Sequence, residues 1–416
     1  MISKLLFNDL VTSGAIAADG ALHPSSSQPE LAAALSYVRS SELTDAPLNP
    51  LLPSMGWSRG IHLSDCGHYL YIAESATTRK PGGVHRFKRN KSGEWIAMPD
   101  AMPSGTPVIS GIIGQVGNNL VIKDTANNIQ LRDLVTFELV GEVDHEPINT
   151  LSLIPETKKA ILLSANNSFD PATGTGTITS ENYWIVDLES MTISDIKPNA
   201  YGIFQLLTNV SGGISLLAHS FNPAISTQRE IIVYDSKGDT WRTMEPAIPE
   251  NEGVYDLSWC PDSDRLFMTV TSPNSSAIGG IHVFDAAGFM SGAPPIRSFY
   301  EFYHDGTKTA RARSHPDGRG GCFFFADEVT PAESSWQGKN IIHIAEDMSV
   351  QTAFAAASEG LFSPRSVLDK AGLKAIFFFP NSRVSTIDLF AAPPEGYFYA
   401  PKIADKNGFP VKIAAD

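Results

Sequence analysis

Short runs of alternating apolar and polar residues recur along most of the chain, separated by turn-forming residues. The clearest example lies at 253–285, where apolar positions at Val254, Leu257 and Trp259 precede a Pro-Asp-Ser-Asp turn. A second run follows from Arg265 to Val270, and a third from Gly280 to Phe284 lies beyond a Ser/Asn/Gly-rich loop. A period of two residues is typical of β-strands, so this stretch predicts three antiparallel strands.

The same strand-turn-strand pattern occurs seven times between about residues 55 and 395. The midpoints of the second strands fall 40 to 57 residues apart, near Leu70, Val121, Ile161, Leu216, Phe267, Phe324 and Phe377. Four strands per repeat is the size of a β-propeller blade. We therefore predict an all-β fold, a seven-bladed β-propeller of four-stranded antiparallel blades with a short, partly helical N-terminal extension. A parallel β-helix would need shorter and more uniform repeats.

Several strands are apolar on both faces, as expected when blades stack face to face around an axis. The runs Cys322–Phe325 and Ile376–Phe379 could suggest a ligand pocket, but as second strands they are better explained as core. In the third repeat, the segment 169–181 reads as a flexible insertion, because its glycines match no phosphate-binding motif.

The chain ends differ from the repeats, which predicts an N-terminal extension at 1–52, a propeller at 53–396 and a C-terminal tail at 397–416. Leu31, Ala34, Leu35 and Val38 recur at helical spacing and predict a helix from Pro29 to about Leu43. The extension is either a docking arm or a cap on the propeller. A propeller also needs a closing strand, for which Ile2–Phe7, Tyr397–Ala400 and Val411–Ala414 are the candidates.

Composition narrows the range of partners and compartments. The net charge of −14 argues against electrostatic attraction to nucleic acid or to an anionic membrane. The N-terminus lacks the apolar core of a signal peptide, and no window approaches the ~18 apolar residues of a membrane span. The three cysteines, Cys66, Cys260 and Cys322, have no metal-ligand spacing. We expect a soluble chain with unpaired thiols, made in a reducing compartment.

The turn sequences LSDCGHYLYIAE, WCPDSDRLFMTV and SHPDGRGGCFFF resemble the repeats of WD40-like and YVTN-type seven-bladed propellers. The Trp-Asp and Gly-His pairs of true WD40 repeats are missing, and third strands end instead in Val186-Asp187, Tyr234-Asp235 or Phe284-Asp285. More narrowly, GGVHRFKRNKSGEW resembles the propeller domains of tailed-bacteriophage virion proteins. This second resemblance implies a structural protein of a phage particle.

Histidines and carboxylates are the candidates for chemistry. Histidines lie one or two to a repeat without metal-binding motifs. Four of them could converge on a central channel from first or third strands, although ordinary strand positions are the simpler interpretation: His62, His85, His282 and His343. Four aspartates follow third strands, where they are expected to accept hydrogen bonds from turn amides: Asp187, Asp235, Asp285 and Asp388.

Two basic clusters occur on predicted hairpins, and we interpret both as solvated faces, with a partner-binding patch as the alternative. The first contains Arg311, Arg313, His315 and Arg319, and the second contains Arg86, Lys88, Arg89 and Lys91. Nucleophile elbows of the GxSxG type are absent from the sequence. The sequence thus predicts no catalytic, cofactor-binding or metal-binding residue.

These observations predict a non-enzymatic structural or assembly protein that uses a rigid propeller as an interaction platform, as a component of a phage virion or tail. The expected partners are other structural proteins, bound through the N-terminal arm and the propeller loops in a symmetric multimer. We expect no nucleic-acid or membrane partner. A cytoplasmic WD40-like scaffold and a metal-dependent propeller hydrolase or lactonase are the alternatives.

Overall fold

A computed structural model of the protein describes the parts of the chain that form its sheets. The described residues are 2–4, 16–17, 22–27, 43, 45–47, 49–52, 58–74, 83–90, 94–99, 109–124, 128–144, 150–170, 175–195, 197–198, 204–219, 229–271, 279–302, 312–326, 339, 341–353, 355–356, 365–369, 374–379, 383–390, 397–399 and 412–415. The helix predicted at 29–43 lies almost entirely outside these residues.

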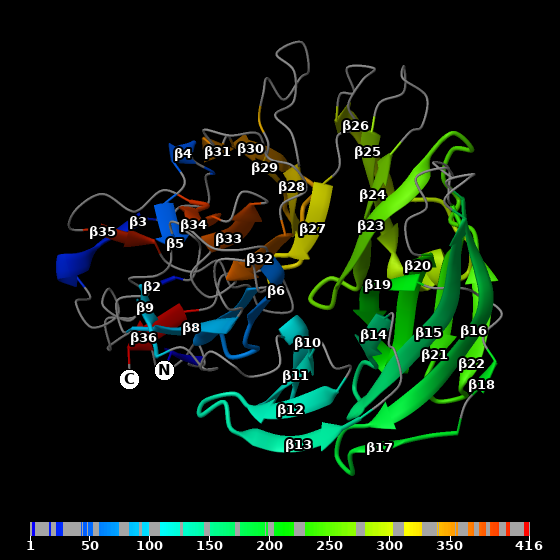
Figure 1. The fold of residues 1–416 in the computed structure, drawn as a ribbon. Helices are drawn as coiled ribbons and strands as arrows, with labels where there is room; N and C mark the ends of the chain where they lie inside the picture. Colours follow the sequence, from blue (N-terminus) through cyan, green and yellow to red (C-terminus); the bar gives the residue numbers. More distant parts are fainter. Residues whose placement is uncertain are drawn as a thin grey trace.

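Seven antiparallel sheets surround a central axis, so the protein is a seven-bladed β-propeller, as predicted (Figure 1). Within each blade the strands follow one another from the axis outward. Blade 1 contains β6 (Ser58–Leu63), β7 (Tyr69–Glu74), β8 (Gly83–Arg89) and β9 (Trp95–Ala97), and blade 2 contains β10 (Ile109–Val116), β11 (Asn119–Asp124), β12 (Ile129–Asp133) and β13 (Leu139–Val143). Blade 3 contains β14 (Thr150–Leu153), β15 (Lys159–Asp170), β16 (Thr175–Asp187) and β17 (Thr192–Ile193), with β18 (Lys197–Pro198) also paired to β16.

The remaining four blades repeat this order, and every second strand lies where its apolar run predicts it. Blade 4 contains β19 (Phe204–Val210), β20 (Ile214–His219), β21 (Ile231–Asp235) and β22 (Thr240–Met244), with the short helix η2 (Ser211–Gly213) between β19 and β20. Blade 5 contains β23 (Gly253–Cys260), β24 (Arg265–Thr271), β25 (Gly279–Asp285) and β26 (Arg297–Phe302), with the short helix α2 (Ala286–Met290) before β26. Blade 6 contains β27 (Ala312–Pro316), β28 (Cys322–Ala326), β29 (Ile341–Ile344) and β30 (Val350–Ala353), and blade 7 contains β32 (Arg365–Asp369), β33 (Lys374–Phe379), β34 (Arg383–Asp388) and β5 (Asn49–Leu52).

The ring is closed by β5, which supplies the outer strand of blade 7 from the N-terminal segment. Leu52 pairs with Val384 and Asn49 with Thr386, in antiparallel register with β34. The predicted closing strands at Ile2–Phe7 and in the C-terminal tail were therefore wrong. Pro50 fits this position because an outermost strand does not need every backbone N–H for a neighbour.

The strands that were predicted to close the ring pair outside the blades. β36 (Lys412–Ala415) lies between β1 (Ile2–Lys4) and β2 (Ile16–Ala17) in one small sheet. β3 (Leu22–Pro24), which precedes the 3₁₀ turn η1 (Ser25–Ser27), pairs with β35 (Tyr397–Tyr399), and β4 (Ala46–Pro47) pairs with β31 (Ala355–Ala356). The described strands of the N-terminal extension are thus all paired within the chain.

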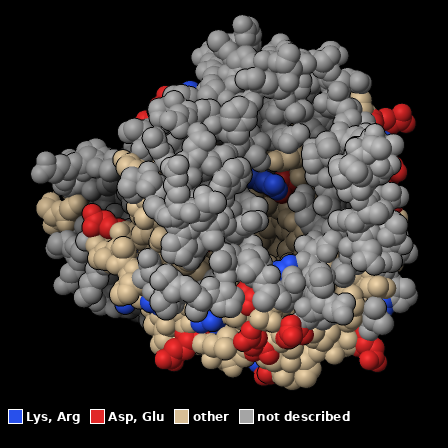
Figure 2. Space-filling model, in the orientation of Figure 1, with Lys and Arg blue, Asp and Glu red and all other residues tan. Residues whose placement is uncertain are grey.

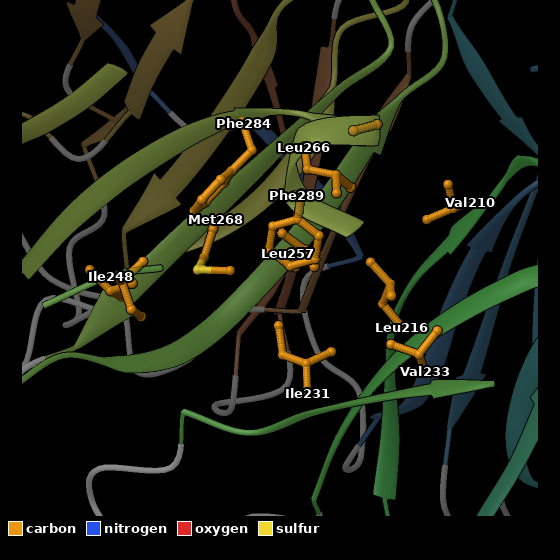
Figure 3. Packing of buried hydrophobic residues seen from close by; sticks show 12 residues of the cluster. Val210, Leu216, Ile231, Val233, Ile248, Leu257, Leu266, Met268, Phe284 and Phe289 are labelled. Carbon is orange, nitrogen blue, oxygen red and sulfur yellow. The ribbon is translucent and has the colours of Figure 1, made fainter. Parts of the chain in front are cut away.

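Each boundary between blades holds its own hydrophobic cluster, because the strands have buried side chains on both faces. In blade 6, Phe323 and Phe325 pack toward blade 7, whereas Cys322 and Phe324 pack toward blade 5. Figure 3 shows the cluster between blades 4 and 5, in which Phe289 of α2 lies close to Leu257 and Met268. The apolar run at 322–325 is therefore core, as predicted; in the second run Ile376 is buried, and the side chains of 377–379 lie outside the described ones.

Polar contacts also join neighbouring inner strands. Ser258 of blade 5 donates to the Ser314 carbonyl of blade 6 at 2.9 Å, and the Ser314 amide donates to Asp256 at 2.7 Å. His315 of blade 6 and Ser366 of blade 7 are hydrogen bonded at 2.8 Å. Blade 7 is tied to blade 1 by an ion pair between Asp369 and Arg89. Cross-blade bonds of this kind keep the blades in register.

Blade 3 departs from the sequence prediction. The segment 169–181 was interpreted as a flexible insertion, but its described residues, 169–170 and 175–181, continue the β15–β16 hairpin. Pairing continues to Asp170 and Thr175, with an irregularity between Ala165 and Asn167. The mixture of Gly, Thr and Ser in this segment hid the strands because it shows no apolar alternation.

Candidate functional site

The four histidines considered for a channel cluster lie on the predicted strands but do not meet. Three of them bind a carboxylate of their own blade: His85 binds Glu74 at 2.7 Å, His282 binds Glu252 at 2.6 Å, and His343 binds Asp317 at 2.8 Å. The fourth, His62 of β6, faces a cavity beside the inner strands. No group of three or more His, Cys, Asp or Glu side chains in the described residues is arranged to hold a metal ion.

The contact between Asp317 and His343 organises the turn that joins β27 to β28. The Asp317 carboxylate also accepts hydrogen bonds from the amides of Arg319 at 2.6 Å and Gly321 at 3.0 Å. Burial raises the pKa of Asp317, but the bonds from His343 and from the two amides outweigh burial, so its pKa lies below the ordinary 3.8. The charged carboxylate therefore stabilises the folded protein.

We expect Asp317→Ala to lower the free energy of unfolding by about 2 kcal/mol at pH 7, because it removes a buried acceptor of three hydrogen bonds. A depressed pKa gives stability that is present above the unfolded pKa and is lost as the pH falls through the folded value. The difference between the two proteins in urea unfolding should thus shrink below pH 3.8. The exposed Asp262→Ala serves as control, and equal effects of both variants would contradict this role.

Three of the four aspartates that follow third strands have the predicted structural role, and for Asp388, which ends β34, that role stays a prediction. Asp187 accepts from the amides of Glu189 and Ser190, Asp235 accepts from Lys237, and Asp285 caps α2 by accepting from Gly288. Bonds from the Ser190 and Glu189 amides hold the pKa of Asp187 below its ordinary value, against a small opposing effect of burial. These carboxylates shape turns.

The two basic clusters are only partly solvated. Arg313 stacks over Tyr255 and lies 3.5 Å from Asp256, which leaves it half-buried. Lys88 lies 6.0 Å from the ring centre of Tyr69. Arg89 contradicts the prediction of a solvated face, because its side chain is 8% exposed and paired with the fully buried Asp369. Residues 91 and 311 lie outside the described part of the chain.

The cysteines are free thiols, as predicted. Cys260 and Cys322 are buried in the cluster between blades 5 and 6, and burial raises the pKa of Cys322 well above its ordinary value. Cys66 is exposed in the turn between β6 and β7. It is thus the one solvent-accessible thiol of the three.

Exposed apolar side chains lie on the outer strands of blades 1 and 2 and in the turn that precedes the outer strand of blade 2. We call this surface the rim patch, and its four exposed side chains are Ile96 (54% exposed), Val135 (50%), Leu139 (48%) and Val140 (57%). Arg86 of β8 links its two halves, because its guanidinium donates to the carbonyls of Pro99 in blade 1 and Val135 in blade 2 at 3.0 to 3.2 Å. The rim patch therefore spans a blade boundary.

The blade 2 part of the rim patch lies on an open sheet edge. Among the described strands β13 pairs only with β12, and its outer edge therefore offers backbone groups to another strand. Exposed acidic residues flank Leu139 and Val140 along this edge: Glu138, Glu142 and Asp144. In Figure 2, acidic side chains gather along the lower rim, where β13 and β17 lie in Figure 1. Like charges on this edge disfavour pairing with a second copy of the chain.

The sequence analysis did not identify the rim patch. The sequence pattern alone does not distinguish Leu139 and Val140, two adjacent exposed apolar residues, from core residues. The place of a strand within its blade could have predicted this exposure. The fourth strand is outermost, so neighbouring blades cover its apolar residues only partly.

Seven antiparallel blades around one axis define a WD40-like β-propeller fold, the class that the sequence pattern predicted. Among solved structures, the chain is similar to the RRP9 WD40 repeats, with a TM-score of 0.54, 8% identity, and coverage of 84% of this chain and 99% of that one. It is also similar to the Neurospora crassa Pan2 WD40 domain, with a TM-score of 0.51, 11% identity, and coverage of 89% and 98%.

At these identities the structural likeness defines the fold and no particular activity. It extends to 1344 chains of known structure, as expected for a widely used architecture. The sequence matches no protein-family model and no curated protein. No helix in the described residues has the length and apolar character to cross a membrane.

Proposed function

We propose that the chain is a non-enzymatic interaction platform that binds a protein partner through the rim patch. The observation that carries the proposal is the exposure of four apolar side chains, three on the outer strands β9 and β13 and one, Val135, in the turn before β13. Contiguous exposed apolar surface is typical of protein interaction sites, and WD40-like propellers in general bind other proteins.

The surroundings of the rim patch indicate the chemistry of the partner. Glu138, Glu142 and Asp144 give the β13 edge a negative field, and the whole chain carries a net charge of −14. A complementary segment carries apolar side chains for Leu139 and Val140 and Lys or Arg side chains for the acidic residues. An extended segment would also use the free backbone groups of β13, as in β-strand addition.

The decisive variant is Leu139→Ser with Val140→Ser, compared with wild type as tagged protein expressed in the native source. We expect the partner retained on the tagged chain to fall at least tenfold, because central apolar contacts carry most of the binding energy of an interface. Retention of the wild-type complex should also weaken at high salt, because exposed opposite charges are screened.

Ile296→Ser is the matched control, since Ile296 is 53% exposed but lies on blade 5. A photo-crosslinker at position 140 should label a net-basic segment of the partner, and one at position 296 should not. Equal loss in the control variant, or a native chain that elutes as a 44.9 kDa monomer, would overturn the proposal.

We further propose that the platform belongs to a phage virion or tail, on the resemblance of GGVHRFKRNKSGEW to virion propellers. The cytoplasmic scaffold is the alternative, which the structural likeness to WD40 domains fits equally. Native sizing with mass spectrometry distinguishes them, because a virion component co-elutes with a megadalton particle. Docking through the N-terminal arm stays a prediction. The four strands β1, β2, β3 and β4 of that arm are each paired with a strand of the same chain, so we favour the rim patch as the docking surface.

A further inference from the structure

A cavity of about 440 Å³ lies where blades 1, 6 and 7 meet at the ends of their inner strands. Its walls come from three segments far apart in the sequence: 62–67, 315–316 and 367–369. This is also the boundary at which the ring closes, since blade 7 contains β5. Figure 2 shows that the middle of the ring is hollow, with charged side chains visible inside it. The volume is that of a small-molecule site.

The walls of the cavity have an apolar and a polar part. Leu63, Pro316, Val367 and Leu368 supply the apolar part. The polar part includes His62, Asp65 and the Cys66 thiol, and the backbone amide of Asp65 is fixed by a 3.0 Å bond to Gln115 of blade 2. The turn that carries these groups is therefore held in place by the neighbouring blade. Such a lining suits a ligand with an apolar body and one polar end.

His62 supplies a buried polar atom on the cavity wall. Its Nε2 atom has no hydrogen-bond partner among the described residues, although it is shielded from solvent. Burial lowers the pKa of His62, against the opposing effects of a hydrogen bond with the Gln115 side chain and of the Asp65 charge, and the lowered pKa favours the neutral ring. A neutral imidazole presents one nitrogen as acceptor and one as donor. A buried polar atom without a partner is costly, and a bound ligand would remove that cost.

The charge of the cavity selects the ligand. Asp369 also lines the wall, but its carboxylate is paired with Arg89. Asp65 has no ion pair among the described residues, and none of the described lining residues is Lys or Arg. The excess charge on the described walls is therefore negative and belongs to Asp65. The overall charge of −14 adds a long-range attraction for cations.

We propose that this cavity binds a primary alkylammonium group, with the ammonium between Asp65 and His62 and the alkyl chain against Leu63, Val367 and Leu368. The ammonium donates hydrogen bonds to the Asp65 carboxylate and to the unprotonated nitrogen of His62. The group belongs either to a free aliphatic amine or to a lysine side chain of a docked protein. Binding joins three blades across the closing boundary of the ring.

Cys66 provides a built-in reporter for the test. It lines the cavity and is exposed, whereas Cys260 and Cys322 are buried, so iodoacetamide should alkylate the folded protein once. Hexylammonium should slow this alkylation saturably, with a dissociation constant of roughly millimolar order for so small a ligand. Lengthening the chain from butyl to hexyl should tighten binding by up to about fourfold per methylene. Intact-mass spectrometry measures the rate, and calorimetry measures the affinity.

Two sets of controls separate the proposal from general shielding. Hexanoate and hexan-1-ol have the same chain length without the cation and should leave the alkylation rate unchanged. Asp65→Asn should weaken hexylammonium binding about tenfold, because it removes the charged acceptor. Asp262→Asn changes an exposed aspartate in the β23–β24 turn of blade 5 and should have no effect. Both positions are exposed turn sites, so both variants are expected to fold.

The outcomes decide the proposal directly. Equal slowing by hexanoate or hexan-1-ol, equal weakening by Asp262→Asn, or no saturable binding up to about 10 mM would overturn it. Tighter binding of Nα-acetyl-lysine methylamide than of hexylammonium would assign the ammonium to a protein side chain, and the reverse order to a free amine. The test uses the isolated chain and does not depend on the rim patch, so the two proposals succeed or fail separately.

Discussion

Asp369→Ala should lower the free energy of unfolding by about 3–5 kcal/mol, the largest effect that we expect of a single substitution in this protein. The variant leaves the Arg89 guanidinium buried without the carboxylate that neutralises it, because the two side chains are 8% and 0% exposed. Arg89 and Asp369 belong to blades 1 and 7, so the loss falls on the boundary where the ring closes. Urea unfolding followed by Trp fluorescence measures the change.

The contribution of the pair itself follows from a double-mutant cycle. Arg89→Ala should cost about as much as Asp369→Ala, whereas Arg89→Met with Asp369→Leu should recover most of the loss, because it removes both charges and keeps the volume. Lys158 and Glu189 form the matched control, with side chains 59% and 69% exposed. Glu189→Ala should change stability by about 0–1 kcal/mol. A cost for Asp369→Ala no larger than this would show that the buried pair does not hold the boundary.

Leu52→Asp should destabilise the protein by about 2–4 kcal/mol, because it places a charge among the apolar side chains that hold the closing strand. Leu51 and Leu52 pack against the cluster that contains Leu70, Ile376 and Val384. Hydrogen exchange should accelerate selectively in β34, whose outer edge depends on β5 for pairing. Asn49→Asp on the same strand is the control, since Asn49 is exposed. Equal exchange in the two variants would rule out β5 as the element that closes the ring.

The blades could be predicted from the sequence because their second strands are short apolar runs with turn residues at fixed positions. A turn such as Pro261-Asp262 precedes β24, and similar turns precede the second strands of other blades. The repeat is therefore visible without a diagnostic motif. β5 could not be predicted in the same way. Its sequence Asn49-Pro50-Leu51-Leu52 shows no alternation, and its strand character comes only from pairing with β34 more than 300 residues away.

The candidate sites depend on spatial neighbours more than on local pattern. His62 was recognised as a first-strand residue, but its cavity is completed by blades 6 and 7, whose turns carry no related motif. Arg89 was interpreted as solvated because it lies in a basic run, and its burial follows from Asp369 on the opposite side of the ring closure. The His85–Glu74 pair, by contrast, lies within one hairpin and could be inferred from register once the strands were placed.

The origin of the closing strand also determines when the protein can finish folding during synthesis. Leu52 leaves the ribosome early, but its partner Val384 is made 332 residues later. At ordinary elongation rates this interval is about 20–60 s, during which the nascent chain has begun to form blades while the last blade lacks its outer strand. Contacts so distant in sequence also form slowly after release. Ring closure must therefore wait until β34 is made, and it depends on β5 remaining free to pair until then.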